Sequence, residues 1–210
     1  MRAVPLPIDG AWLFEPTTFA DDRGTFTVPF QAAAFAGALG YDLPVAQVNH
    51  SVSQAGVIRG VHFADVPPGQ AKYLHVAAGA IRDVVVDIRV GSPTFGRHTV
   101  VDLDAAAPRA VFLAEGLGHA FQALTDGTVV GYLCSTPYDP SREHGIHPLD
   151  PELALPWRDD LAPVLSPKDT VAPGLADAVD QGLLPTHRAC AEHYTRLRAG
   201  SPRHAAGAGG

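Results

Sequence analysis

Residues 81–89 read IRDVVVDIR, a run that combines charged and aliphatic side chains. Asp83, Val85, Asp87 and Arg89 alternate there with Val84, Val86 and Ile88, so one set is mostly polar and the other is entirely aliphatic. Because successive side chains of a strand point to opposite faces, this alternation predicts a β-strand with one buried face. We expect the polar side chains to lie on the other face, where they can line a cavity.

Short runs of similar character occur on both sides of this stretch, separated by Gly, Pro, Asp and Asn. They lie at 45–52, 57–63, 72–76, 98–103, 110–113 and 129–135. Helical patterns are found only toward the ends, at 31–39 with Gly40 as the C-terminal glycine, and at 175–181 and 188–198. About ten strands with helices at the periphery predict an all-β fold, a double-sheet jelly roll of the cupin-like kind.

The chain divides by composition into three parts. A jelly-roll domain is expected over 1–185, although strand patterns give way to Pro- and Asp-rich sequence after Pro140. A C-terminal helix is expected over 186–199. The Gly- and Ala-rich tail, 200–210, is expected to be disordered.

The composition limits the class of ligand and the cellular setting. The 210 residues carry a formal charge of −7, which argues against nucleic acid and requires any anion to be held by a local group of Arg and Lys. The chain has no basic start followed by an apolar run and no long apolar stretch, so we expect neither secretion nor a membrane span. Two widely separated cysteines, Cys134 and Cys190, predict no disulfide framework, so a reducing cytoplasm is expected.

An arginine and a histidine stand close together in the run at 57–63. Strict alternation puts Arg59 and His62 on opposite faces, so a shared ligand requires a bulge, which Gly60 permits. The turn at 66–69 then leads to Lys72, and the pattern predicts a hairpin. Alone, a strand histidine is more often a hydrogen-bonded structural residue.

Five further residues are candidates with equally plain structural explanations. His119 follows two glycines, which suggests either a ligand contact or a histidine beside a tight turn. Tyr132 and Tyr138 fit ordinary packing. Ser166-Pro167-Lys168-Asp169 is expected outside regular structure, where its cation and carboxylate are either solvated or, for the carboxylate, paired with His62.

Metal and cofactor motifs are missing from the sequence. His62 is followed by Phe63 and Ala64, so no HxH pair offers a second imidazole on the same face. The chain also contains no Walker A loop, no dinucleotide-binding fingerprint and no GxSxG turn. We therefore expect no bound metal and no cofactor.

Taken together, the chain resembles the dTDP-4-dehydrorhamnose 3,5-epimerase family over about residues 8–185. Several ordered blocks carry this resemblance and are more specific together than any one motif. They are FADDRG at 19–24, QVNHS at 47–51, RGVHF at 59–63, GQAK at 69–72, DVVVDIR at 83–89, GSPTFG at 91–96, GHAF at 118–121 and SPKD at 166–169.

The resemblance implies a cofactor-free homodimer that acts on a dTDP-linked 4-keto-6-deoxyhexose. His62 matches the general base, Asp169 its carboxylate partner and Tyr132 the proton donor on the opposite face of the sugar. Lys72 matches the cation beside the enolate oxygen at C4. The expected substrate contacts are His119 in the sugar pocket, Tyr138 on thymine, Arg23, Arg59 and Lys168 on the diphosphate and nucleotide, and Gln47, Asn49 and Glu143 as further polar contacts.

The sequence leaves several alternatives open. Val28 stands where the family usually has a glutamate that meets the nucleobase, which puts thymine selectivity in question. Inversion at C3 alone, or at C3 and C5, fits the same residues. A nucleotide-sugar 3,4-ketoisomerase and a non-catalytic sugar-nucleotide-binding barrel remain alternatives. The resemblance also suggests that an N-terminal strand crosses to a neighbouring subunit and brings Arg23 to its ligand.

Overall fold

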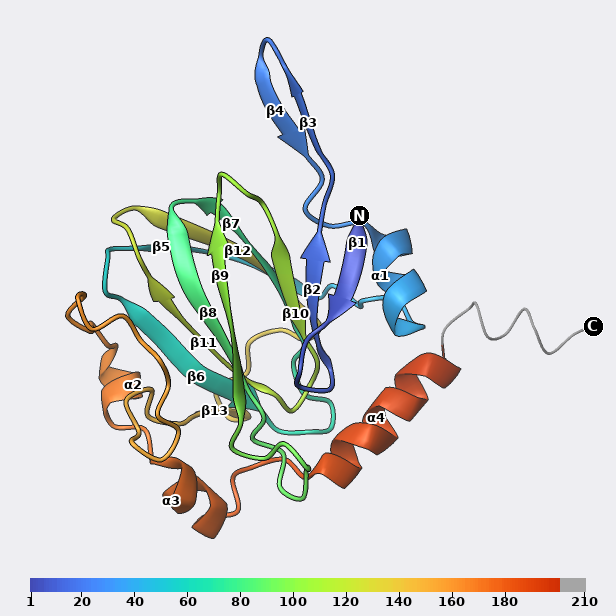
Figure 1. Cartoon of the computed structure of the whole chain (residues 1–210). Helices are drawn as coiled ribbons and strands as arrows, with labels where there is room; N and C mark the ends of the chain where they lie inside the picture. The colour runs from blue at the N-terminus through green and yellow to red at the C-terminus, as the bar shows by residue number, and fades with distance from the viewer. Residues whose placement is uncertain (201–210) are drawn as a thin grey trace, which may run out of the picture.

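A computed structural model describes residues 1–200 and consists mainly of two facing antiparallel sheets (Figure 1). The first has the order β1 (Arg2–Pro5), β2 (Ala11–Glu15), β10 (Ala110–Leu113), β7 (Lys72–Ala78), β12 (Thr128–Cys134), β5 (Gln47–Ser53). The second has the order β13 (Glu143–Gly145), β6 (Ile58–Ala64), β11 (Gly118–Ala123), β8 (Ala80–Val86), β9 (His98–Asp104). The predicted double-sheet jelly roll is confirmed.

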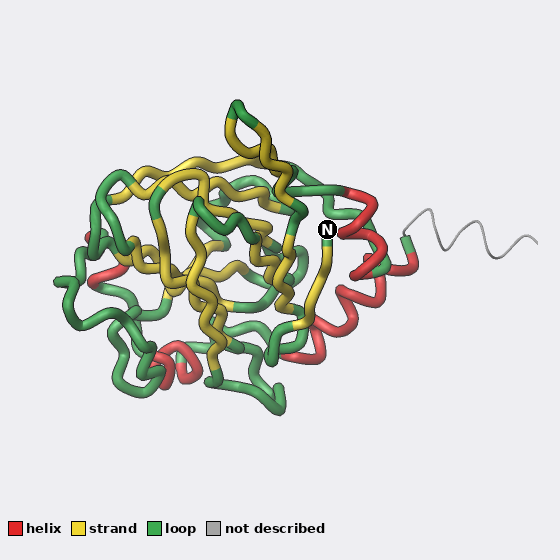
Figure 2. The backbone as a smooth tube through the Cα atoms, turned by 45° about the horizontal axis from the view of Figure 1, so that its top comes forward, coloured by secondary structure: helices red, strands yellow, loops and turns green. Residues whose placement is uncertain are grey.

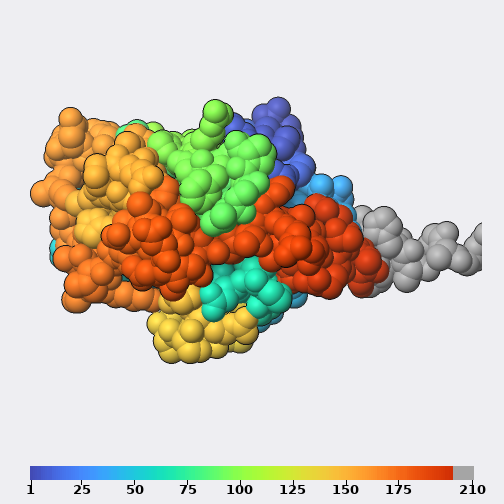
Figure 3. Space-filling model, turned by 90° about the horizontal axis from the view of Figure 1, so that it is seen from below, coloured from blue at the N-terminus to red at the C-terminus, as the bar shows by residue number. Residues whose placement is uncertain are grey.

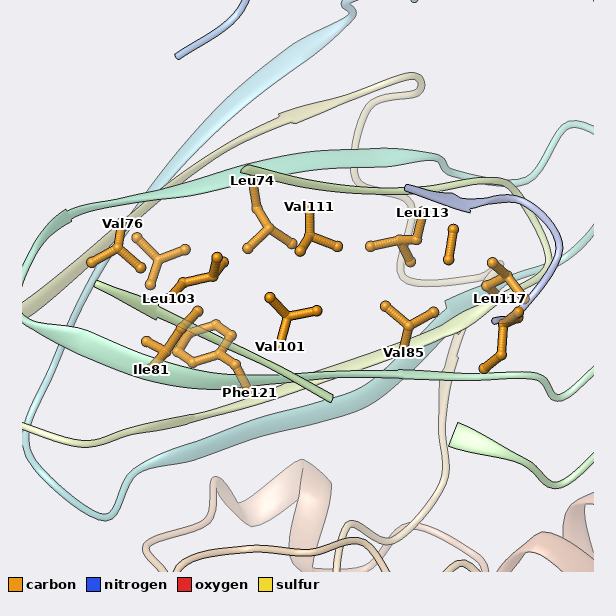
Figure 4. Close-up of a cluster of buried hydrophobic side chains, with 13 residues drawn as sticks. Leu74, Val76, Ile81, Val85, Val101, Leu103, Val111, Leu113, Leu117 and Phe121 are labelled. Carbon is orange, nitrogen blue, oxygen red and sulfur yellow. The ribbon is translucent and has the colours of Figure 1, made fainter. Parts of the chain in front are cut away.

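Aliphatic side chains fill one part of the space between the sheets (Figure 4). Leu74 and Val111 come from the six-stranded sheet and meet Val85 and Leu103 of the five-stranded sheet, all with almost no exposed surface. The close-up shows the two sets pointing toward each other across the gap. Burial of this apolar surface is the main force that holds the two sheets together.

Strand β8 differs in detail from the prediction for residues 81–89. The strand ends at Val86, and both of its faces are buried. Asp83 shares the inner face with Ile81 and Val85 and so lies inside the barrel. Beyond the strand, Asp87 and Arg89 form a buried ion pair at 2.8 Å, so the predicted polar face does not form a continuous row.

Helices pack against the outside of both sheets and lie at the two sides of the barrel in Figure 2. Helices α1 (Ala32–Leu39) and α4 (His187–Ala199) pack through Phe35 and Tyr194 on the six-stranded sheet, while α3 (Leu175–Asp180) packs on the other. Gly40 ends α1 with a φ of 83°, as predicted. Seen from below, the orange and red surface of the later chain covers much of that face (Figure 3). The predicted tail, beyond Gly200, lies outside the described residues.

Three local predictions were wrong. Strands β6 and β7 belong to different sheets, so the turn between them joins the two walls of the barrel and is not a hairpin. Residues 167–170 form a one-turn helix, α2 (Pro167–Thr170), because the Ser166 hydroxyl accepts a hydrogen bond from the backbone N–H of Asp169 and caps it. A short strand, β13, also forms after Pro140 and pairs with β6.

A two-stranded hairpin stands apart from both sheets. It consists of β3 (Thr18–Asp21) and β4 (Gly24–Thr27) and projects from the body of the molecule in Figure 1. Phe19 and Phe26 on this hairpin are 60% and 65% exposed, which leaves two aromatic rings without a core of their own. Among residues 1–200, no helix has the length and apolar character needed to cross a membrane.

Candidate active site

A cavity of about 440 Å³ lies between the sheets beside the aliphatic core. Both walls and the segment around α2 contribute to its lining. Every candidate site residue from the sequence lines it except Arg23; the lining candidates are His62, Tyr132, Asp169, Lys72, Gln47, Asn49, Arg59, His119, Tyr138, Glu143 and Lys168. The cavity also has lining residues that sequence reasoning missed, Val57, Ile58, Gln70, Phe121, Val164, Leu165 and Ser166.

A bulge in β6 explains how Arg59 and His62 reach the same cavity. His62 lies opposite His119 and Arg59 opposite Phe121, so three steps along β6 match two along β11. Gly60 sits at the bulge with a φ of 125°, and a Cβ atom there would collide with the carbonyl oxygen of His119. The predicted bulge at Gly60 is confirmed.

His62 is held by a carboxylate that comes from 107 positions later in the chain. Its Nε2 lies 2.7 Å from Oδ1 of Asp169, whose side chain is only 5% exposed. Oδ2 of Asp169 accepts a hydrogen bond from the Ser166 hydroxyl at 2.8 Å, so the helix cap also orients the carboxylate. Because Asp169 is an acceptor when ionised, it favours the ring form with hydrogen on Nε2 and leaves Nδ1 available to a ligand.

The surroundings of this pair favour a neutral imidazole beside an ionised carboxylate. Enclosure of the ring lowers the pKa of His62, and the positive charge of Lys72 adds to this, although the hydrogen bond to Asp169 acts in the opposite direction. Burial alone would raise the pKa of Asp169, but the hydrogen bonds from His62 and Ser166 lower it overall. A neutral ring near neutral pH is able to accept a proton.

The opposite wall presents a cation and a phenol to the same cavity. Cys134 of β12 lies between Lys72 of β7 and Gln47 of β5 in register, and Tyr132 lies opposite Asn49. Residues two apart on a strand share a face, so these side chains form two neighbouring rows across the sheet. A hydrogen bond of 2.6 Å from Gln47 to Asn49 ties the rows together at the edge strand.

Burial shifts both Lys72 and Tyr132 toward their uncharged forms. It lowers the pKa of Lys72, which is 9% exposed, while Cys134 and Glu143 act to raise it. It raises the pKa of Tyr132, so the phenol keeps its proton near neutral pH. The wall facing His62 therefore carries a buried amine beside a phenol that has a proton to donate.

A second histidine that lines the cavity, His119, is paired with a carboxylate buried behind it. Nε2 of His119 lies 2.6 Å from Oδ1 of Asp83, and both side chains are buried. His119 is the second residue of strand β11 and follows the tight turn at 115–116, so it both lies beside a turn, as suggested, and lines the cavity. Asp83 was not among the site candidates from the sequence. The signal available in the sequence was the place of Asp83 on the mostly polar face predicted for residues 81–89.

Polar and aromatic groups surround the entrance to the cavity. Arg59 and Lys168 are exposed cations, and the ring of Tyr138 is 55% exposed. Glu143 accepts a hydrogen bond from the amide of Gln70 at 3.2 Å. These two cations at the entrance can form the local anion site that a chain of net negative charge requires.

Arg23 lies elsewhere, in the turn of the projecting hairpin. Its side chain is 90% exposed and pairs with Asp21, and it does not line the cavity of its own chain.

Over residues 1–200, no group of three or more His, Cys, Asp and Glu side chains has the arrangement of a metal site.

This arrangement suits the transfer of a proton across a small ligand. One wall offers a neutral imidazole that can take a proton, and the other offers a phenol that can give one. Lys72 can place a positive charge beside an oxygen that becomes negative. These are the groups that a reaction at a carbon beside a carbonyl requires.

Comparison with known proteins gives consistent matches over most of the chain. The family model described as dTDP-4-dehydrorhamnose 3,5-epimerase matches residues 5–177. A protein of Streptomyces griseus with that same name is 55% identical over 186 residues, covering 89% of this chain and 92% of its own.

Two solved structures show the same likeness in three dimensions. The rmlC epimerase of Mycobacterium tuberculosis has a TM-score of 0.92 at 46% identity and covers 94% of this chain and 100% of its own. ChmJ, a 3'-monoepimerase from Streptomyces bikiniensis in complex with dTDP-quinovose, has a TM-score of 0.91 at 50% identity. The match covers 92% of this chain and 98% of that one.

Proposed function

The chain belongs to the dTDP-4-dehydrorhamnose 3,5-epimerase family, and from that premise we propose that it inverts C3, or C3 and C5, of a dTDP-linked 4-keto-6-deoxyhexose. The observation that carries the proposal is the placement of His62 with Asp169 on one side of the cavity and of Lys72 with Tyr132 on the other. Inversion needs a base on one face of a carbon and an acid on the other.

The reaction begins with the loss of a proton from a carbon beside the C4 ketone. His62 takes that proton, and the electron pair of the C–H bond moves into the ring to give an enolate with its charge on the C4 oxygen. Lys72 stabilises this oxyanion. The negative charge of the enolate in turn offsets the cost of burying the charged amine of Lys72. Asp169 stabilises the imidazolium that forms on His62.

Tyr132 completes the inversion from the opposite face. Its phenol gives a proton to the same carbon, the C4 ketone forms again, and the configuration at that carbon is reversed. Solvent then removes the proton from His62 and returns one to Tyr132, so the enzyme ends the cycle unchanged. All steps use side chains of this chain, and the proton balance closes.

The nucleotide part of the substrate extends toward the entrance. Arg59 and Lys168 neutralise the diphosphate, Tyr138 stacks on the base, and Gln47, Asn49 and Glu143 supply polar contacts. Support comes from the position of these residues around one opening and from the positive charge of two of them.

Proton NMR in D₂O tests this function directly. The protein is incubated with dTDP-4-keto-6-deoxyglucose while the signals of the hydrogens at C3 and C5 are followed separately. Loss of the C3 signal alone identifies a 3-epimerase, and loss of both identifies a 3,5-epimerase. A product with the keto group moved to C3 would favour a 3,4-ketoisomerase. Retention of both signals with bound ligand would leave only a binding protein.

We also propose that the protein acts as a homodimer through the projecting hairpin and the β5 edge. The exposed rings of Phe19 and Phe26 and the exposed Val48 and Val52 give apolar surface for a second copy of the chain. Arg23, remote from its own cavity, then completes the neighbouring site.

With its two free, buried cysteines, the protein fits a reducing cytoplasm, which we also propose.

A mixed dimer tests the crossing of Arg23. One subunit carries Arg23→Ala and the other His62→Ala, and activity is compared with that of each parent homodimer. If the hairpin crosses, one site has an intact His62 and receives an intact Arg23, so about half of the wild-type activity returns. If Arg23 serves its own subunit, neither site is complete and the mixture stays as inactive as its parents.

A further inference from the structure

Two histidines that line the cavity are each paired with a carboxylate, and the proposed reaction uses only one of these pairs. In both, a carboxylate oxygen lies within 2.7 Å of Nε2 of the histidine. The His62 side chain is 32% exposed, whereas His119 is 9% and Asp83 is 0% exposed. The second pair is therefore the more enclosed, which suits a group held in one orientation.

The surroundings of Asp83 give its carboxylate no hydrogen-bond partner among residues 1–200 other than His119. Its neighbours on the inner face of β8, Ile81 and Val85, belong to the aliphatic core. A buried carboxylate among such side chains is costly unless it is hydrogen-bonded. Within residues 1–200 its Oδ1 bonds to His119, while Oδ2 is buried without a partner. The stability of the fold gives no reason to keep an acid there in place of an aliphatic residue.

The pair leaves one nitrogen of His119 for a ligand. Nε2 is occupied by Asp83, and Nδ1 has no hydrogen-bond partner among the described residues, although the ring lines the cavity. A hydroxyl group suits Nδ1 in either protonation state, because a hydroxyl both donates and accepts hydrogen bonds. The two acidic residues that line the cavity, Asp169 and Glu143, already accept hydrogen bonds from protein side chains.

We propose that Asp83 is a positioning residue that holds His119 with Nδ1 against the C2 hydroxyl of the sugar. This inference rests on the proposed substrate. A 4-keto-6-deoxyhexose linked through C1 to a diphosphate has free hydroxyls only at C2 and C3. The C3 hydroxyl changes face when C3 inverts, but the C2 hydroxyl stays in place. A rigidly held imidazole therefore matches the C2 hydroxyl, which anchors the sugar while the neighbouring carbon reacts.

A substrate without the C2 hydroxyl gives the most direct test. We expect the wild-type protein to process dTDP-4-keto-2,6-dideoxyglucose with a kcat/KM roughly tenfold to a hundredfold below that of the 2-hydroxy sugar, as for loss of one buried hydrogen bond. In Asp83→Asn and His119→Ala proteins the ratio of the two kcat/KM values should fall close to one. This ratio does not depend on how much protein is folded.

A double-mutant comparison tests whether Asp83 acts through His119. Asp83→Asn alone should lower kcat/KM for the 2-hydroxy sugar, mainly through KM. In the His119→Ala background the same change should have less than about a twofold effect, since the residue it positions is gone. The matched control is Asp65→Asn, because Asp65 pairs with His144 at 2.8 Å and neither residue lines the catalytic cavity. This control should keep the wild-type ratio.

The outcomes separate this inference from the proposed function. If the wild-type protein processes neither sugar, the proposed function fails. If it processes the 2-hydroxy sugar but Asp83→Asn keeps full discrimination between the sugars, only the role of Asp83 is overturned. Equal losses from Asp83→Asn with and without His119 would also overturn it, because they would indicate a purely structural acid. Discrimination lost in both single variants, with no further loss in the double variant, supports it.

Discussion

The space between the sheets has two halves that the same strands build in different ways. In the apolar half, Leu103, Val111 and their neighbours pack against one another with almost no exposed surface. In the cavity half, the walls carry His62, Lys72 and Tyr132 around an open volume. A single strand passes from one to the other, as β7 does from Val76 to Lys72. The apolar half stabilises the fold through close packing, whereas the cavity half leaves an open volume lined by reactive side chains.

Removal of the base is expected to have the largest effect, and mainly on activity. His62→Ala takes away a positioned proton acceptor, worth roughly 10²–10⁴-fold in rate. The ring belongs to no apolar cluster and Asp169 keeps its hydrogen bond from Ser166, so the free energy of unfolding should fall by no more than about 1–3 kcal/mol, the cost of one unpaired oxygen on a buried carboxylate. Turnover assays and urea unfolding on the same preparation check both parts. An unfolded variant would show that the two halves are not separable in this way.

Replacement of the buried amine should lower the rate without lowering the stability of the fold. Lys72→Met removes the charge beside the C4 oxygen, and loss of one such stabilising group costs roughly 10²–10³-fold in kcat. Burial already disfavours the charged form, as the lowered pKa of Lys72 indicates, so the variant should unfold at the same or a higher urea concentration. A variant with near-normal kcat would contradict the role of the amine.

The opposite pattern is expected in the apolar half. Leu103→Ala leaves a hole at a side chain that is 1% exposed and should lower the free energy of unfolding by about 2–5 kcal/mol. Because Leu103 does not line the cavity, kcat at a temperature where the protein is folded should stay close to wild type. Chemical denaturation and turnover measured together check the prediction; a large fall in kcat would mean that the halves are mechanically coupled.

The dependence of rate on pH is the smallest of these effects and concerns the cavity half alone. His62 must be neutral to accept a proton, so kcat/KM falls as pH decreases and the ring becomes protonated. Enclosure lowers the pKa of His62, so this fall should lie below the ordinary histidine value of about 6.5. Asp169→Asn removes a group that raises this pKa, and the fall should move to still lower pH. A shift to higher pH would contradict the pairing.

The sequence was sufficient for the fold class and for most side chains of the cavity. Period-two patterns located the main strands, and the parity of Arg59 and His62 required the bulge found at Gly60. These inferences succeeded because they depend on local geometry, which a strand imposes on neighbouring residues whatever the rest of the chain does.

Inferences that needed the relation between distant segments did not follow from local patterns. A turn after β6 looks the same whether the next strand pairs with β6 or crosses to the other sheet, so the hairpin was wrong. The contact of Asp83 with His119 depends on the register of β8 and β11, which their own residues do not reveal. The one-turn helix at Asp169 did have a signal, since a serine three residues before an acid is a capping pattern.

Deuterium exchange by a Tyr132→Phe protein tests the central claim that base and acid act from opposite walls. The phenol is lost, but His62 and Lys72 remain, so the base can still remove the C3 hydrogen and return solvent deuterium to the same face. We predict deuterium at C3 in sugar of unchanged configuration, with the inverted product reduced by roughly 10²-fold or more. Inverted product at a wild-type rate, or a complete absence of exchange in a folded protein that binds the sugar, would contradict the account.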